Sequence, residues 1–136
     1  MGRILSIDYG KKRTGIAVTD PLNIIATGLT TIETPKLVQF LKEYIGGEEV
    51  EEVIIGMPLN LDDSDTDATP MVRHFINVFK RTFPAIPITE VDERYTSKAA
   101  SQAMLQMGLK KKDRQNKALV DEIAATLMLQ EYLTKR

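Results

Sequence analysis

The sequence predicts an α/β fold in which a five-stranded mixed sheet carries helices on both faces. Three observations lead to this prediction. Three short apolar or threonine-rich segments follow one another closely in the first quarter of the chain, which is typical of an antiparallel meander. Two further apolar segments come after segments with helical spacing of their apolar residues, and helical crossovers join parallel strands. Apolar residues make up 43% of the sequence and charged residues 27%, as in globular proteins.

The strands are predicted in the following order. Residues 4–8 and 14–19 are joined by a short basic turn, and residues 27–32, rich in threonine, extend the same antiparallel unit. Residues 53–56 form a continuous apolar run of the kind that is buried on both faces of a sheet. Residues 88–91 form the fifth strand. The last two strands are therefore expected to run parallel to the first.

Four segments have the spacing of helices. The first begins at Pro35 and ends at the glycine pair 46–47. The second begins with Thr69 as its N-cap, and a proline takes the first helical position. Gly108 ends the third, and the fourth extends to Leu133 near the C-terminus. The predicted order is β-β-β-α-β-α-β-α-α in one domain of 136 residues.

Several classes of protein and site are excluded by what the sequence lacks. It has no cysteine, so we expect no disulfide framework, no thiolate zinc site and no cysteine nucleophile. The only histidine, His74, lies on the polar side of a predicted helix and is expected at the surface. The apolar runs are too short to cross a bilayer, and the N-terminus has no apolar signal core. We expect a cytoplasmic protein that has no membrane contact.

The net charge of −1 does not by itself indicate a polyanionic partner. The charges are nevertheless grouped, with basic clusters at 11–13 and 110–117 and acidic clusters at 48–52 and 62–67. A local basic patch on a neutral protein can bind phosphates. A solvated charged surface is the alternative interpretation for each cluster taken alone.

A carboxylate stands at the end of the first strand. Asp8 follows the apolar run 4–7 and precedes a glycine and three cations. Burying an unpaired carboxylate costs several kcal/mol, so Asp8 is expected at the strand end with a partner or a metal. The glycine, Gly10, allows a sharp turn without a side chain that crowds the site.

Other acids are expected beside Asp8. Functional groups in open α/β sheets gather at the carboxyl ends of the strands, and the fifth strand ends at Asp92 and Glu93. Asp121 lies near the start of the last helix, on a face with small residues such as Ala125, which favours a position facing the sheet. A favourable acid near a helix N-terminus is the alternative interpretation of Asp121.

Converging carboxylates repel one another and need a cation. Mg²⁺ or Mn²⁺ fits best, because these hard ions prefer oxygen ligands together with water and phosphate. Two such ions about 4 Å apart can activate a water and stabilise the leaving oxygen of a phosphodiester.

With these residues in place, the chain resembles the YqgF family, relatives of bacterial Holliday-junction resolvases in the RNase H superfamily. The resemblance extends over nearly the whole chain and depends on four motifs in order: ILSIDYGKKRTGIAVTD, VIIGMPLNLDD, EVDERYTSKAA and KALVDEIAATLMLQEYL. It implies a single RNase H-like nuclease domain over residues 1–136, a cytoplasmic location and maturation of the 5′ end of 16S ribosomal RNA. Resolvase activity on branched DNA has also been proposed for members of the family.

The resemblance also implies a set of acids that hold Mg²⁺ or Mn²⁺. Asp8 in SIDYG matches the first-strand aspartate, and Asp121 in VDEIAA matches the acid of the last helix. Glu93 in DER is the expected third acid, with Asp92 in reserve because it points to the other face of the strand. In resolvases the middle acid comes from the fourth strand, whereas here that strand ends in the carboxylate-free sequence GMP at 56–58.

Three cations beside these acids, Lys12, Arg13 and Arg94, are expected to contact substrate phosphates through charge-assisted hydrogen bonds. Nothing in the sequence indicates reading of base edges, so we expect contacts mainly with the nucleic-acid backbone, weak sequence preference and strong salt dependence. A resolvase would act as a homodimer, while an enzyme that trims RNA could act as a monomer.

The loop at 62–67 departs from the family pattern. Its aspartates imitate the start of a calcium loop, D-x-D-x-D, but Ala68 stands where an EF-hand needs glycine and His74 where it needs glutamate. We reject a calcium site and expect a mobile acidic loop beside the active site.

Two other functions are compatible with the pattern. A strand that ends in Asp, followed by Gly and a basic turn, also describes the phosphate loop of the actin, hexokinase and Hsp70 class. Those proteins clamp ATP between two such domains, whereas this chain has one. The second alternative is an RNase H-like scaffold that binds nucleic acid without cutting it, because the fourth strand lacks its acid.

Overall fold

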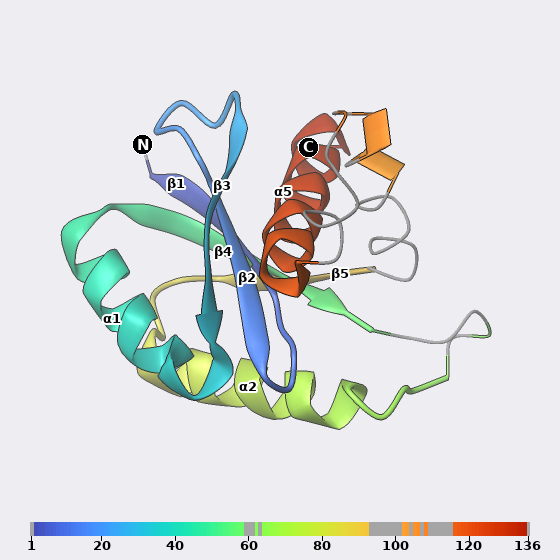
Figure 1. Ribbon diagram of the computed structural model, residues 1–136. Coiled ribbons are helices and arrows are strands. Elements are labelled where there is room, and N and C mark those ends of the chain that lie inside the picture. Colours follow the sequence, from blue (N-terminus) through green and yellow to red (C-terminus); the bar gives the residue numbers. More distant parts are fainter. Residues whose placement is uncertain are drawn as a thin grey trace.

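Five strands form one mixed sheet in the order β3-β2-β1-β4-β5 (Figure 1). The structure is a computed structural model that describes residues 2–58, 62, 64–92, 102–103, 105–106, 108 and 116–135. The strands are β1 (Arg3–Asp8), β2 (Arg13–Thr19), β3 (Ala26–Glu33), β4 (Val50–Met57) and β5 (Ile88–Asp92). The first three pair antiparallel, and β4 and β5 run parallel to β1. The predicted α/β fold with a mixed sheet is confirmed.

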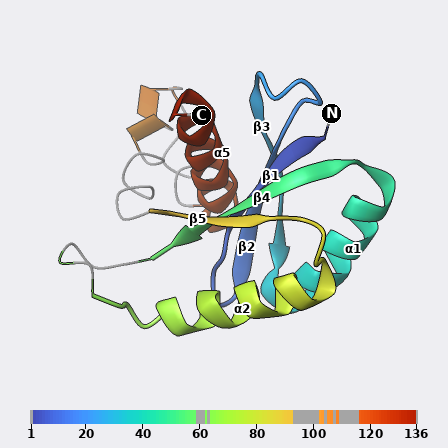
Figure 2. The same cartoon turned by 180° about the vertical axis from the view of Figure 1, so that it is seen from behind.

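The helices cover both faces of the sheet, as predicted. The described helices are η1 (Thr34–Lys36), α1 (Leu37–Gly47), α2 (Thr69–Thr82) and α5 (Lys117–Lys135). Figure 2 shows α1 and α2 on one side of the sheet and α5 on the other. Because η1, a 3₁₀ turn, takes the position of Pro35, α1 begins two residues later than the proline suggested.

Side chains of β1 alternate between two cores, because successive residues of a strand point to opposite faces. Leu5 and Ile7 pack with α1 and α2 in the larger core, which also holds Phe75 and Phe79. Ile4 packs on the α5 side in a smaller core of aliphatic residues. The residues 53–55 of β4 are fully buried, as expected of a strand covered on both faces.

The start of α2 differs from the prediction. Thr69 is the first helical residue, and Ala68 takes the N-cap position without a side-chain hydrogen bond. The hydroxyl of Thr69 instead accepts the N–H of Thr66 at 2.8 Å and donates to the carbonyl of Pro58 at 2.5 Å. The buried Thr69 therefore ties the preceding loop to the end of β4, a role that local propensity cannot reveal.

The third predicted helix falls mainly outside the described residues. Gln102, Ala103, Leu105 and Gln106 are helical, and Gly108 has φ of 73°. This left-handed conformation agrees with the prediction that a glycine ends the segment. His74 is exposed, as predicted. Within the described part of the chain, no helix is long and apolar enough to cross a membrane.

The carboxylate of Asp20 holds the loop between β2 and β3 through its backbone. Asp20 accepts the backbone N–H groups of Leu22, Ile24 and Ile25 at 3.1, 2.8 and 2.7 Å. Asn23 lies between them with φ of 58°, a conformation that asparagine tolerates better than most residues. The hydrogen bond from Ile25, joined by those from Ile24 and Leu22, holds the pKa of the Asp20 carboxyl below its usual 3.8.

The lowered pKa gives a prediction for acid stability. We expect Asp20→Ala to destabilise the fold at neutral pH, because three N–H groups lose their acceptor. The difference from the wild type persists above pH 3.8 and disappears as the pH falls through the lower pKa of the folded state. Thermal midpoints followed by circular dichroism between pH 7 and pH 2.5 measure this difference. Asp67→Ala, on another exposed loop, is the control, and a pH-independent difference would contradict the prediction.

Candidate active site

Asp8 is the last residue of β1 and is half-buried. Its partner on β2 is Gly15, directly opposite in the antiparallel pair. The alternation along β1 places Asp8 on the α5 side of the sheet, together with Ile4 and Ser6. The carboxylate therefore stands at the carboxyl end of the strand and on the face that α5 covers.

Asp121 reaches the same place from α5. A Cβ built on Gly15 would overlap the backbone carbonyl of Asp121, so the helix backbone rests directly on this glycine. The following turns of α5 bury Ala124 and Ala125 against the sheet. The prediction that the face carrying Asp121 is turned toward the sheet is confirmed.

A second contact fixes the register between β1 and α5. The buried hydroxyl of Ser6 donates to the carbonyl of Ala125 at 2.9 Å. Asp8 lies two residues further along β1, an advance of about 6.6 Å. Asp121 lies four residues before Ala125, about 6 Å along the helix. Gly15, which pairs with Asp8, also contacts the backbone of Asp121. The step along β1 and the step along α5 therefore lead toward the same end of the sheet, and the two acids belong to one site.

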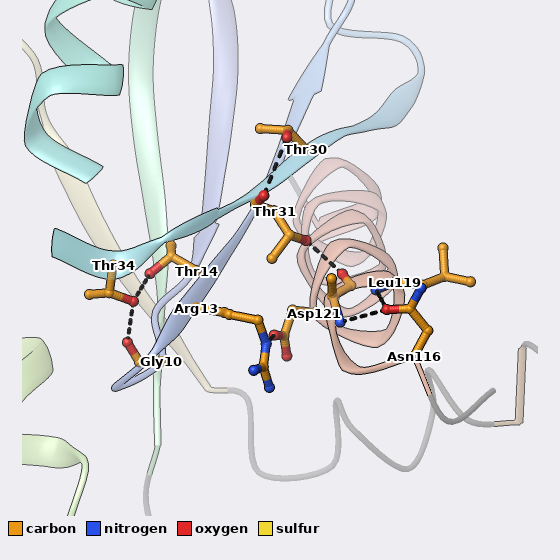
Figure 3. A network of polar contacts seen from close by, with 10 residues as sticks. Gly10, Arg13, Thr14, Thr30, Thr31, Thr34, Asn116, Leu119 and Asp121 are labelled. Carbon is orange, nitrogen blue, oxygen red and sulfur yellow. Dashed lines mark hydrogen bonds and ion pairs between the residues drawn. The ribbon is translucent and has the colours of Figure 1, made fainter. Parts of the chain in front are cut away.

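Arg13 supplies a cation to this site. Its Nε donates to Oδ2 of Asp121 at 3.4 Å, across 108 residues of sequence (Figure 3). Both side chains are partly exposed, at 37% for Arg13 and 28% for Asp121. The basic turn that precedes β2 thus stands beside the acid of the last helix.

Hydrogen bonds from Thr34 anchor this basic turn. Its N–H donates to the carbonyl of Lys12 at 3.0 Å, and its hydroxyl donates to the carbonyl of Gly10 at 2.6 Å. The hydroxyl of Thr14 lies 2.9 Å from that of Thr34 (Figure 3). The backbone of the turn is therefore held in place, while the side chain of Lys12 is exposed to solvent.

The first turn of α5 is also held, by residues that the sequence analysis did not single out. Oδ1 of Asn116 accepts the N–H groups of Ala118 and Leu119 at 3.1 and 3.4 Å. The hydroxyl of Thr31 on β3 donates to the carbonyl of Ala118 at 2.6 Å (Figure 3). The asparagine just before the helix was a signal for the N-cap. The contact of Thr31 had no local signal, because it depends on tertiary packing.

Tyr9 fixes the chain on the other side of Asp8. Its ring lies 5.2 Å from that of Phe75 on α2, measured between ring centroids. Burial raises the pKa of the Tyr9 hydroxyl. Both chain neighbours of Asp8, Ile7 and Tyr9, are thereby anchored in the larger core, on the face opposite to α5.

The ends of β4 and β5 complete the edge where β1 ends. Gly56 pairs with Val91, and Met57 pairs with Asp92. The expectation that the ends of β1, β4 and β5 lie side by side is confirmed. Val91 packs against the α5 core, so the alternation assigns the exposed Asp92 to the opposite face.

Two predicted site residues, Glu93 and Arg94, lie outside the described residues. The structure therefore brings together Asp8, Asp121 and Arg13, with Lys12 on the adjoining turn. Among the residues that the structure describes, no three acidic or histidine side chains form a group suited to a metal. The pair of carboxylates supplies hard oxygen donors of the kind that Mg²⁺ and Mn²⁺ prefer.

Two carboxylates of the acidic loop, Asp62 and Asp65, have partners in the protein. Oδ1 of Asp62 accepts the N–H of Ser64 at 3.0 Å and its hydroxyl at 2.5 Å, and these bonds lower the pKa of Asp62. Asp65 binds both terminal nitrogens of Arg73 at 2.6 and 3.0 Å.

The chain matches a known family over nearly its whole length. The model of the family described as "RuvX: Holliday junction resolvase" matches residues 2–135. The chain is 54% identical to a protein of Flavobacterium psychrophilum over 136 residues, covering 100% of this chain and 99% of that protein. It is 49% identical to a protein of Porphyromonas gingivalis over 133 residues, covering 98% and 96%. Both relatives are named "Putative pre-16S rRNA nuclease".

Solved structures support the fold. The chain is similar to "T. thermophilus RuvC in complex with Holliday junction substrate", with a TM-score of 0.59 and 18% identity over 100% of this chain and 96% of that one. A second structure, "Thermus thermophilus RuvC structure", gives a TM-score of 0.54 and 14% identity over 98% and 95%. The predicted RNase H-like fold is confirmed by this likeness.

The close packing at Gly15 gives a prediction. We expect Gly15→Ala to destabilise the fold by about 1–3 kcal/mol, because the added methyl group overlaps the backbone of α5 and must push the helix away. Urea unfolding followed by circular dichroism measures the loss. Gly46→Ala is the matched control, because nothing lies within 4 Å of its added carbon and alanine favours a helix. Equal stability of the two variants would contradict the proposed contact.

Proposed function

The chain belongs to the RuvX family of Holliday junction resolvases, and from this membership we propose that it is a nuclease that hydrolyses phosphodiester bonds with a divalent metal ion. The single observation that carries the proposal is the convergence of Asp8 and Asp121, which come from opposite ends of the chain to one edge of the sheet. Two carboxylates at one site repel each other when both are ionised, and a divalent cation between them would remove this repulsion.

Precursor 16S ribosomal RNA is the proposed substrate, and the reaction is maturation of its 5′ end. Relatives that are 49–54% identical over nearly the whole chain have names that refer to this RNA. Branched DNA is the second candidate, favoured by the description of the family as Holliday junction resolvases. A scaffold that binds nucleic acid without cutting it is the outcome that the experiment below must exclude.

Asp8 and Asp121 would hold the metal through their carboxylate oxygens. When bound, Mg²⁺ or Mn²⁺ supplies an activated water and stabilises charge on the leaving oxygen. We propose Glu93 as the third acid and keep Asp92 in reserve. The packing of Val91 against the α5 core supports Glu93, because a strand continuing beyond β5 would point residue 93 to the same face as residue 91.

The cations are proposed to hold the substrate. Lys12 and Arg94 would contact phosphates beside the metal, and Arg13 stands next to Asp121 with the same potential role. Fixing the phosphate against the acids orients the scissile bond, and orientation is a large part of what an enzyme contributes to such a reaction. The anchored backbone of the basic turn supports this proposal, since it presents Lys12 from a defined position.

We expect Asp8→Asn and Asp121→Asn each to reduce cleavage at least a hundredfold, because each removes a charged ligand of the metal. Cleavage of a labelled precursor 16S RNA fragment, a single-stranded RNA and a four-way DNA junction measures the effect, each with Mg²⁺, Mn²⁺ or EDTA. Glu131→Gln is the control, because it makes the same change of acid to amide at the other end of α5, where Glu131 pairs with Lys135.

The preferred substrate in that experiment separates the two candidate reactions. Cutting of the RNA and not the junction supports maturation of RNA, and the opposite result supports resolution of branched DNA. Full activity of Asp8→Asn, or no cutting of any substrate by a wild type that binds it, would overturn the proposed catalytic site.

Binding without cleavage tests the proposed phosphate contacts. We expect the logarithm of the binding constant to fall linearly with the logarithm of salt concentration. Lys12→Ala should reduce the magnitude of this slope by about 1, because one phosphate contact is lost. Fluorescence anisotropy of labelled RNA in EDTA measures the slope between 50 and 300 mM KCl, conditions chosen to span about a twofold change in screening length. Lys42→Ala, an exposed lysine on α1, serves as the comparison. A slope that Lys12→Ala leaves unchanged would contradict the contact.

A further inference from the structure

Arg13 provides a positive charge beside Asp121, one of the two acids proposed to bind the metal. Its guanidinium contacts Asp121 through Nε at 3.4 Å, and Figure 3 shows the terminal nitrogens of Arg13 beyond this contact. The side chain comes from the first residue of β2, two residues before the glycine on which α5 rests. Arg13 is therefore held close to the acidic site by the same packing that positions Asp121.

The contact between Arg13 and Asp121 is longer than the bidentate pair that Arg73 forms on α2. Arg73 binds Asp65 through both terminal nitrogens, at 2.6 and 3.0 Å. Such a bidentate pair uses the whole fork of the guanidinium and is difficult to exchange. Arg13 contacts Asp121 through Nε, so its two terminal nitrogens can bind a second anion, such as a phosphate. The pair is also partly exposed, so water can replace either partner during exchange.

A divalent ion and Arg13 would compete for Asp121. Both stabilise the same carboxylate, and two cations beside one carboxylate repel each other. An ion held by Asp8 and Asp121 would stand against the guanidinium and weaken its attraction to Asp121. The guanidinium would then be available to an anion that arrives with the metal, and in a nuclease this anion is a phosphate of the substrate.

We propose that Arg13 is the counter-charge of Asp121 before the metal binds, and that a divalent ion displaces it onto a phosphate of the substrate. This inference rests on the proposed function, because it assumes that Asp8 and Asp121 bind the metal. It makes Arg13 a positioning residue that links metal binding to substrate binding. By linkage, a metal that releases Arg13 favours the substrate, and the substrate favours the metal to the same degree.

Titration with Mn²⁺ tests the competition without any catalytic step. Free Mn²⁺ is measured by electron paramagnetic resonance for the wild type, Arg13→Gln, Arg13→Lys and Arg3→Gln at low salt. We expect Arg13→Gln to bind Mn²⁺ about three- to tenfold more tightly, because the competing charge is gone. Arg13→Lys keeps a charge and stays within about twofold of the wild type. Arg3→Gln is the matched control, because Arg3 contacts Glu48 through Nε at the same 3.4 Å but away from the site.

A second measurement follows the arginine itself. The Nε–H resonance of Arg13, assigned by its absence from Arg13→Lys, is recorded during titration of the wild type with Mg²⁺. We expect this resonance to shift with the same midpoint as metal binding, while that of Arg3 stays unchanged. In the Mn²⁺ titration, 0.5 M KCl reduces the difference between the wild type and Arg13→Gln, because salt screens a partly exposed charge.

The outcomes separate this inference from the proposed function. A wild type that binds no Mn²⁺ overturns the metal site itself. Metal binding by the wild type with equal affinity in a folded Arg13→Gln variant, or with weaker affinity, overturns the role of Arg13 and leaves the nuclease proposal intact. Tighter binding by Arg13→Gln, together with the shift of the Nε–H resonance, supports displacement of the guanidinium by the metal.

Discussion

The site depends on the contact between the backbone of α5 at Asp121 and the bare Cα of Gly15. No side chain separates helix from sheet at this point, so the acid of the last helix approaches the carboxyl end of β1 as closely as two backbones allow. Gly15 is also the partner of Asp8, which makes one glycine the junction between both acids. The hydrogen bond from Ser6 to Ala125 then fixes the register of the helix along the strand.

The two faces of the sheet are packed differently, and the difference serves the site. The face under α1 and α2 is filled by large side chains, among them Phe75 and Phe79. The face under α5 is lined by smaller ones such as Ala17 and Ala125. Small residues let the helix lie near the sheet, whereas an aromatic layer would hold it away. The larger core holds more of the buried apolar residues, and the smaller one lies under the helix that carries Asp121.

Charge is balanced across this thin side. Asp8 and Asp121 would repel each other, and Arg13 offsets part of that repulsion from the start of β2. The exposed Lys12 follows on the same anchored turn. The acid at the end of β1 and the cations of the turn that follows therefore lie side by side, so carboxylate oxygens adjoin positively charged groups. This arrangement explains why a chain with a net charge of −1 can still act on a polyanion.

The sequence by itself determined the strands, their mixed pairing, the position of Asp8 at a strand end and the face of Asp121, because periodicity records which side of an element is buried. It also indicated the family through four motifs. It could not determine that the hydroxyl of Thr69 binds the preceding loop, or that Arg13 meets Asp121 across 108 residues. Glu93 remains a prediction, since it lies outside the described residues. Only the tertiary structure decided the partners of Thr69 and Arg13. A contact between distant segments depends on how closely two elements pack, and no local sequence pattern records that distance.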